Sequence, residues 1–415
     1  MSDKAKKTIN VVIIAIIVFL MVAFAVFFFF LRDGSAPTPG GSGFPSFPTS
    51  TPGGGEPGGG TLPPPGSTST PPITPPSTGA FKPILRQISA TPVAGGIIFK
   101  KDNKQMVRYV DRAKGFVYET EAEKISPVKL TVNTILRVYE AYFKGDGNAV
   151  ILRYLKDDSD QILTFYGNIE RRTGSAESEL KGNFLSSNIN NLAVAPSSNR
   201  IFYIVSSAGA TGILSALDGT SRFQIFDSPL SHWTALWPRE NMAMVVSKPS
   251  GLDVGSAYFV DTASGRMTPV LSGVPGLTAL PNPTTESVLY AKTSGSDFSL
   301  MLRNVRNASD REMYLKTLPE KCVWSEKTPD IAYCAVPNRI SPAVYPDDWY
   351  QGSVSFSDEV WKINTTTGAT EFIMNLEDNA RSPFDAIEIK LNQDENFLHF
   401  INKENLSYWS LQIAP

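Results

Sequence analysis

From residue 81 to residue 415, short runs of β-branched and aromatic residues alternate with polar turns, and no long helical period appears. The first half of the recurring unit is an apolar run, a tight polar turn and a second apolar run, as in NLAVAPSSNRIFYIV from Asn191. The second half is a further strand, a turn carrying Asp, Asn or Gly, and a closing strand, as in AYFVDTASGRMTPVL from Ala257. This order predicts a repeated four-stranded antiparallel meander.

Seven such units follow one another at a spacing of about 40 to 65 residues, which is the size of propeller blades. The run GGIIFKK from Gly95 is a degenerate first member, and one insertion lengthens the sixth unit. Each sheet must bury its faces against its neighbours, so the units are stable only when they stack around an axis. We therefore expect an all-β domain over residues 81–415, a seven-bladed β-propeller, with six or eight blades as alternatives.

The two ends of this domain are predicted to close the ring. The last unit supplies three strands and ends at LSYWSLQI from Leu406. The run ILRQIS at residues 84–89 would supply the missing fourth strand. This pairing would remove the exposed edge that an open ring would leave.

A different hydrophobic pattern precedes the repeats. Residues 9–31 form a nearly uninterrupted apolar run of about 23 residues, enough to cross a hydrocarbon core of roughly 30 Å as a helix. The alternative is a cleaved signal peptide, but the run is longer than a typical one and lacks a small-x-small site. Lys4, Lys6 and Lys7 precede it. They predict a cytoplasmic tail over residues 1–8, a single-pass signal anchor in the cell membrane and an extracytoplasmic C-terminal side.

Residues 32–80 are rich in proline, glycine, serine and threonine and hold almost no large apolar side chains. Such a segment buries too little surface to offset its ordering entropy, so we expect a disordered linker. In a polyproline-like form it would reach on the order of 100 to 150 Å, and a passive spacer is the simplest interpretation.

Charge and rare residue types exclude several functions. The chain holds 38 Lys and Arg residues against 40 Asp and Glu residues, and no basic stripe is interleaved with aromatics. A nucleic-acid partner is therefore not expected. Two histidines and two cysteines are too few for a zinc or iron–sulfur site with the usual ligand spacing. We expect neither a metal nor a cofactor.

Cys322 and Cys334 flank the turn of one predicted hairpin. Counting back from that turn places them opposite each other or one step apart on neighbouring strands. A disulfide is then geometrically possible, and the oxidising side of the membrane favours it. The alternative is two buried thiols that act as small hydrophobes.

The longest interruption of the repeat lies in the sixth unit, from Pro337 to Glu359. It gathers clustered aromatic and acidic residues: Tyr345, Asp347, Asp348, Trp349 and Tyr350. Clustered Trp and Tyr on a loop offer flat apolar surface with polar edges, which predicts a binding site for peptides or sugars. The alternative is an aromatic flap packed against the domain. A calcium site is disfavoured because two adjacent carboxylates fall short of the six to eight oxygens that Ca²⁺ takes.

The turns KGDG at residues 144–147 and VDTASG at residues 260–265 resemble those of the TolB-type, WD40-like family of propeller repeats. The resemblance covers most of residues 84–415 and is one of architecture. The turns PREN, PTTE and EKTP in other units depart from the family pattern. The resemblance implies a binding platform, since members of this family usually act in that way.

The function is predicted to be that of a non-catalytic binding or scaffolding module, displayed at the cell surface for an unknown protein or glycan. An anchor followed by a propeller also resembles membrane-bound prolyl peptidases. However, no G-x-S-x-G motif occurs, and His232 and His399 are scattered and not expected to be catalytic. The alternative is a carboxylate-based hydrolase or lyase that acts on extracellular glycan in the propeller funnel, with paired Asp or Glu residues from different blades.

Overall fold

The structure is a computed structural model that describes residues 81–156 and 159–415. The predicted cytoplasmic tail, the predicted span 9–31 and the predicted linker 32–80 lie outside the described residues. Within the described residues, no helix combines the length and the apolar character that a membrane crossing requires.

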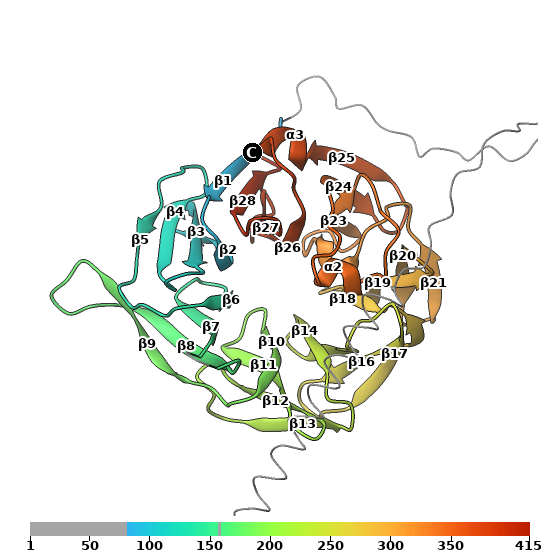
Figure 1. Cartoon of the computed structure of the whole chain (residues 1–415), viewed down its shortest axis with the longest axis horizontal. Helices are drawn as coiled ribbons and strands as arrows, with labels where there is room; N and C mark the ends of the chain where they lie inside the picture. Colours follow the sequence, from blue (N-terminus) through green and yellow to red (C-terminus); the bar gives the residue numbers. More distant parts are fainter. Residues whose placement is uncertain (1–80, 157–158) are drawn as a thin grey trace, which may run out of the picture. The chain divides into compact units, whose positions relative to one another are not determined.

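Seven four-stranded antiparallel sheets are arranged around a central axis (Figure 1). We number the sheets as blades 1 to 7 in chain order. Blade 1 holds β2 (Val93–Lys101), β3 (Lys104–Asp111), β4 (Val117–Glu121) and β5 (Val128–Lys129). Blade 2 holds β6 (Val138–Phe143), β7 (Ala149–Leu155), β8 (Ile162–Arg171) and β9 (Ser178–Phe184). Blade 3 holds β10 (Ile189–Val194), β11 (Arg200–Ser206), β12 (Ala210–Ala216) and β13 (Phe223–Ser228).

Blades 4 to 7 repeat the same order. Blade 4 holds β14 (Trp233–Arg239), β15 (Met242–Ser247), β16 (Val254–Asp261) and β17 (Met267–Pro275). Blade 5 holds β18 (Thr278–Pro281), β19 (Ser287–Ser294), β20 (Asp297–Asn304) and β21 (Ser309–Glu312). Blade 6 holds β22 (Cys322–Trp324), β23 (Ile331–Pro337), β24 (Asp358–Asn364) and β25 (Thr370–Asn375). Blade 7 holds β26 (Ala386–Leu391), β27 (Phe397–Asn402), β28 (Tyr408–Gln412) and β1 (Ile84–Ser89).

The expected ring closure is confirmed. Strand β1 is antiparallel to β28, and Leu85 faces Leu411 while Gln87 faces Trp409. The outermost strand of blade 7 therefore comes from the N-terminal side of the domain, and its three other strands come from the C-terminal side. The predicted seven-bladed propeller is confirmed, and the alternatives of six and eight blades are excluded.

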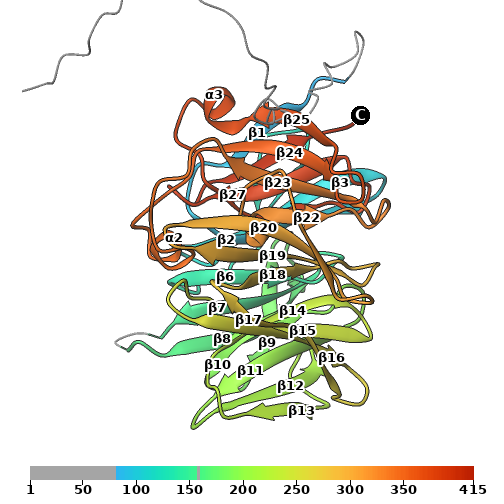
Figure 2. The same cartoon turned by 90° about the vertical axis from the view of Figure 1, so that its right-hand side faces the viewer.

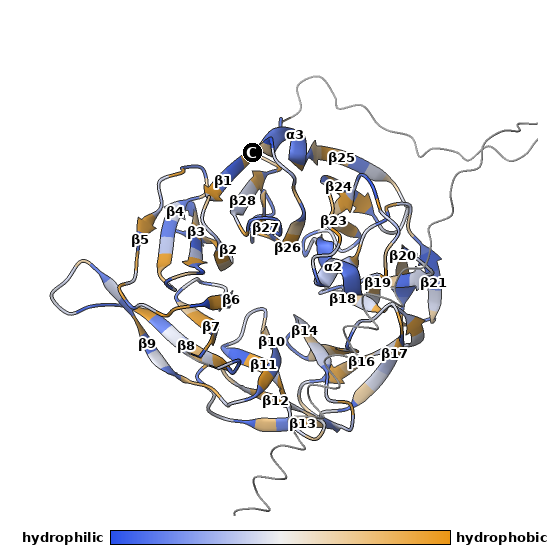
Figure 3. Ribbon diagram, in the orientation of Figure 1, coloured by the Kyte–Doolittle hydropathy of each residue, from blue (hydrophilic) through white to orange (hydrophobic). Residues whose placement is uncertain are grey.

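The hydrophobic core lies between neighbouring blades. Hydrophobic stretches run along the strands of every blade (Figure 3). One cluster joins Val110 and Val117 of blade 1 to Val138 and Val150 of blade 2. Because each cluster needs two blades, no single sheet could bury its own apolar side chains.

Close packing of two blades explains the glycine at position 95, in the run GGIIFKK that departs from the repeat pattern. A Cβ atom at this position would lie 2.1 Å from the carbonyl oxygen of Ala141 in β6. Only glycine allows the inner strands of blades 1 and 2 to approach so closely.

Three short helices interrupt the repeat: η1 (Pro319–Lys321), α2 (Asp347–Tyr350) and α3 (Leu376–Ala380). Helix α2 lies in the long connection between β23 and β24, which is the insertion expected in the sixth unit. It points toward the centre of the ring in Figure 1, and Figure 2 shows it at one face of the ring.

Candidate functional site

The long connection in blade 6 places two of its predicted binding residues in the core. Tyr345 is 1% exposed and Trp349 is 3% exposed. The ring centroid of Phe356 lies 5.8 Å from that of Tyr345 and 5.8 Å from that of Trp349. The alternative of an aromatic flap packed against the domain therefore describes these two side chains. Tyr350 is 46% exposed, so it is the aromatic residue of this loop that a ligand can reach.

The two aspartates of the loop accept hydrogen bonds from backbone N–H groups. Asp347 Oδ2 accepts from the Gly251 N–H of blade 4 at 2.6 Å, and Asp348 Oδ2 accepts from the Val344 N–H at 2.7 Å. These bonds hold α2 against a turn of blade 4 and close the loop on itself. Among residues 81–156 and 159–415, no group of three or more His, Cys, Asp or Glu side chains is placed to hold a metal ion. The binding role predicted for this loop stays a prediction.

Three fully buried charges lie beneath α2, and the sequence analysis missed them. Lys321 Nζ donates to Asp385 Oδ1 at 2.5 Å and to Asp358 Oδ2 at 2.8 Å. Trp349 Nε1 donates to Asp385 Oδ2 at 2.8 Å. Burial raises the pKa of the Asp358 carboxyl to about 6, although the positive charge of Lys321 acts in the opposite direction. The Trp349 side chain therefore covers a buried charged cluster formed by Lys321, Asp358 and Asp385.

No sequence signal marks this cluster. Lys321 ends η1, Asp358 begins β24 and Asp385 precedes β26, so the three residues come from separate segments. Each lies at the end of an apolar run, where charged residues are typical of a solvated strand end.

Cys322 and Cys334 form a disulfide, as the hairpin geometry predicted. They face each other directly across β22 and β23, with their Cα atoms 4.0 Å apart. Both side chains are buried, so the bridge fastens the two inner strands of blade 6.

The two histidines occupy structural surroundings. His399 is buried in β27, and its Nδ1 shares a hydrogen bond of 2.8 Å with the Tyr408 hydroxyl. Burial lowers the pKa of His399 to about 3, so the ring is neutral at physiological pH. His232 lies at the surface, where its Nδ1 is 3.0 Å from the Ser231 hydroxyl.

Two carboxylates come from the innermost strands of blades 2 and 7. Glu140 of β6 accepts from Arg153 at 2.7 Å and from the Tyr142 hydroxyl at 3.0 Å. Glu388 of β26 has a left-handed backbone, with φ of 53°, at an irregularity in the pairing with β27. Its side chain is accessible to solvent, but the protein around it displaces enough water to raise its pKa, and the charge of Glu140 adds to the rise.

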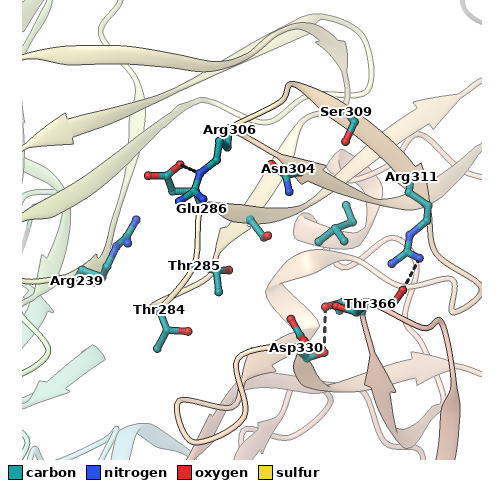
Figure 4. Close-up of a pocket in the computed structure, with 13 residues that line it drawn as sticks. Arg239, Thr284, Thr285, Glu286, Asn304, Arg306, Ser309, Arg311, Asp330 and Thr366 are labelled. Atoms are coloured by element: carbon teal, nitrogen blue, oxygen red, sulfur yellow. Dashed lines mark hydrogen bonds and ion pairs between the residues drawn. The ribbon is translucent and has the colours of Figure 1, made fainter.

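A polar cavity of about 640 Å³ lies among the turns of blades 4, 5 and 6. Connections alternate between the two ends of an antiparallel meander, so this cavity lies at the strand ends opposite to α2. Arg239, Glu286 and Arg306 lie on one side of the opening, and Arg311 and Thr366 lie on the other (Figure 4). The remaining wall holds small hydroxyl and amide side chains and the carboxylate of Asp330, with Leu302 as its large apolar residue. The cavity is therefore suited to a polar ligand.

The guanidinium groups of this cavity are only partly neutralised. Arg306 lies 3.5 Å from Glu286. Arg311 donates to the carbonyl oxygen of Thr366 at 2.9 Å, and Arg239 donates to the sulfur of Met242 at 3.2 Å. Within the described part of the chain, neither Arg239 nor Arg311 pairs with a carboxylate, and the buried Nε of Arg239 has no hydrogen-bond partner. Three arginines thus line the cavity against two carboxylates, Glu286 and Asp330, and the guanidinium groups of Arg239 and Arg311 are available to an anionic ligand.

Comparison with known proteins supports the fold and leaves the function open. The sequence matches no protein-family model and no curated protein. Oligogalacturonate lyase from Vibrio parahaemolyticus is 10% identical over 79% of this chain and 91% of its own, with a TM-score of 0.51. This similarity shows the fold alone.

Two further solved structures are similar to this chain. TolB from Acinetobacter baumannii is 10% identical over 67% of this chain, with a TM-score of 0.42. A puromycin-hydrolyzing peptidase from Mycobacterium tuberculosis is 12% identical over 75% of this chain, with a TM-score of 0.45. The chain spans 65% of the TolB chain and 52% of the peptidase chain. The class that the fold defines is the seven-bladed β-propeller.

Proposed function

We propose that this chain is a membrane-anchored, extracytoplasmic propeller that binds acidic glycan without catalysing its turnover. The single observation that carries the proposal is the polar cavity among the turns of blades 4, 5 and 6. The apolar run at residues 9–31 and the linker composition at residues 32–80 support the location outside the membrane.

The chemistry of the cavity favours a ligand with both hydroxyl and acidic groups. The planar guanidinium groups of Arg239 and Arg311 suit the oxygen pairs of a carboxylate or phosphate. Thr285, Thr366 and the amide of Asn304 line the same space and suit the hydroxyl groups of a sugar. An apolar ligand is disfavoured because large apolar side chains are scarce in the wall.

A binding measurement with the full chain in detergent tests this function. We expect polygalacturonate to bind, with neutral dextran as the matched polymer that does not. Arg239→Gln and Arg311→Gln should each weaken binding about tenfold or more, since a hydrogen bond to a charged group contributes about 1.5 to 3 kcal/mol. Higher salt should weaken binding further.

Arg172→Gln is the control, because Arg172 lies in the turn between β8 and β9 of blade 2, far from the cavity in the fold. Its binding should equal that of the natural chain. The proposal is wrong if dextran binds as tightly as polygalacturonate, or if the three variants behave alike.

The second candidate is the carboxylate-based hydrolase or lyase. Glu388 supports it, because a strained backbone at a strand irregularity and a raised carboxyl pKa are both features found at catalytic sites. The ion pair of Glu140 with Arg153 disfavours it, because that carboxylate is already engaged. Release of shortened or unsaturated products from polygalacturonate, abolished by Glu388→Gln, would establish this activity and replace the binding role.

A further inference from the structure

Lys321 is buried in surroundings that are unusual for an amine. Its side chain has no solvent exposure. The nitrogen donates to Asp385 Oδ1 at 2.5 Å, to Asp358 Oδ2 at 2.8 Å and to the Ala386 carbonyl oxygen at 2.9 Å. The ring centroids of Trp349 and Phe356 each lie 5.2 Å from it. Water is thus excluded, and the nitrogen is held against two carboxyl groups.

The two oxygens of Asp385 have different surroundings. Oδ1 faces the lysine nitrogen. Oδ2 accepts from Trp349 Nε1 at 2.8 Å and from the Phe356 N–H at 3.1 Å. The Ser355 hydroxyl lies 3.2 Å from Oδ2, but its one proton has a closer acceptor in Glu404. Trp349 Nε1 and the Phe356 N–H are two fixed donors at one oxygen, the arrangement that stabilises the oxyanion when a nucleophile adds to a carboxyl carbon.

Asp358 is placed to carry protons between the two groups. Its Oδ2 contacts the lysine nitrogen and accepts from the Ala386 N–H at 2.6 Å. Its Oδ1 is buried and has no hydrogen-bond partner in the described structure. A buried carboxyl with a free oxygen can take up a proton from the ammonium group without losing a hydrogen bond.

We propose that Lys321 and Asp385 form an intramolecular isopeptide bond, with Asp358 as the proton-transfer group. These three residues form one site together with the donors to Asp385 Oδ2. The aromatic rings of Trp349 and Phe356 cover this site. The bond would join the entry to blade 6 with the entry to blade 7.

The reaction balances without a cofactor or an oxidant. Asp358 takes a proton from the Lys321 ammonium, and the free amine adds to the Asp385 Cγ atom. Trp349 Nε1 and the Phe356 N–H stabilise the negative charge that develops on Oδ2. The bond between Cγ and Oδ1 then breaks, and Oδ1 leaves as water with two protons that Asp358 has carried from the nitrogen. The amide keeps one proton on nitrogen, and Asp358 is regenerated as a carboxylate.

The alternative is a permanent buried ion pair between free side chains. Burying one ammonium group with two carboxylates carries a large desolvation cost, which a neutral amide does not bear. Proximity in a dry, rigid site also accelerates a reaction that is otherwise slow. Both arguments favour the covalent product.

Mass spectrometry of the full chain, purified and fully reduced, tests the proposal. The reduced chain should be lighter than its sequence mass by about 18 Da, the mass of one water. Trypsin should leave the bond after Lys321 uncut. It should also release one branched species that joins residues 317–327 to residues 382–390.

Variants identify the role of each group. Lys321→Met should restore the full sequence mass, and Asp358→Asn should do the same while leaving Lys321 and Asp385 as free side chains. Asp378→Asn, at an exposed position in α3, is the matched control and should keep the loss of about 18 Da.

Two results would overturn the proposal even if the variants fail to fold, because both are read on the natural chain. One is the full sequence mass with normal cleavage after Lys321. The other is a loss of water confined to the separate peptide 382–390, since that result would mean dehydration of Asp385 alone. The polygalacturonate measurement is independent of both, so the proposed function and this bond can fail separately.

Discussion

Leu85 lies directly opposite Leu411 across β1 and β28, so strands from the two ends of the domain complete one sheet. The pair is antiparallel and continues through Arg86 and Ser410. Without β1, strand β28 would be an unpaired edge that could pair with another chain. Closure should therefore contribute to the stability of the whole propeller.

Ile88 tests this contribution. It is 2% exposed in β1 and belongs to the cluster of buried residues that contains Phe397 and Tyr408. Ile88→Ala should lower the free energy of unfolding by about 2 to 4 kcal/mol, through lost burial and the cavity left behind. Urea denaturation measures the change. Ile84→Ala on the same strand is the control, because Ile84 is 42% exposed; an equal loss in both variants would contradict the argument.

The aromatic residues of α2 should separate into a structural one and an accessible one. Trp349→Ala removes a buried ring and the indole donor to Asp385, so it should cost about 3 to 5 kcal/mol. Tyr350→Ala removes a half-exposed ring and one hydrogen bond to Glu320, and should cost about 1 kcal/mol. Thermal unfolding of both variants compares the two.

This contrast also changes how ligand capture by the loop should be tested. Tyr350→Ala is the suitable variant, since loss of capture by Trp349→Ala would follow from instability. Unchanged binding of every tested glycan and protein in the Tyr350 variant would remove the binding role predicted for this loop.

The disulfide should stabilise blade 6. Cys322 and Cys334 are 12 residues apart, and closing a loop of about that length contributes roughly 2 to 3 kcal/mol by restricting the unfolded chain. The urea midpoint should therefore fall when the natural chain is reduced. The double variant Cys322→Ala and Cys334→Ala should have a low midpoint that does not respond to reductant. Two free thiols in the unreduced protein would show that the bridge is absent in solution.

We expect burial of His399 to lower the free energy of unfolding in mild acid. The pKa of its ring is about 3 in the folded chain and about 6.5 in an unfolded one. The unfolded chain therefore binds a proton that the folded chain does not, and stability falls as the pH drops below about 6.5 toward 3. His399→Gln should flatten this part of the profile of unfolding free energy against pH.

His232→Gln is the control for that measurement, because His232 lies at the surface beside Ser231. Its profile should match that of the natural chain. If His399→Gln keeps the full slope between pH 6.5 and 4, the acid sensitivity originates elsewhere.

Local pattern was enough to predict the architecture. Alternation of apolar and polar residues is imposed on every strand by the two faces of a sheet, so each hairpin could be recognised in isolation. Counting from the turn between Cys322 and Cys334 placed them opposite each other or one step apart, and the structure shows that they are directly opposite. The closing strand at residues 84–89 was predictable because the last unit lacked one strand.

The site residues required the tertiary structure. The sequence predicted Trp349 as a binding residue of the loop, because no neighbouring residue indicates that its ring packs against Lys321 and donates to Asp385. Arg239 ends β14 of blade 4 and Arg311 lies in β21 of blade 5, and only the stacking of those blades places them around one cavity. The sequence by itself therefore determined the strands, their repeat and their closure, because these depend on neighbours along the chain. The tertiary structure alone decided which charges meet and which are buried, because such encounters depend on how distant blades pack around the axis.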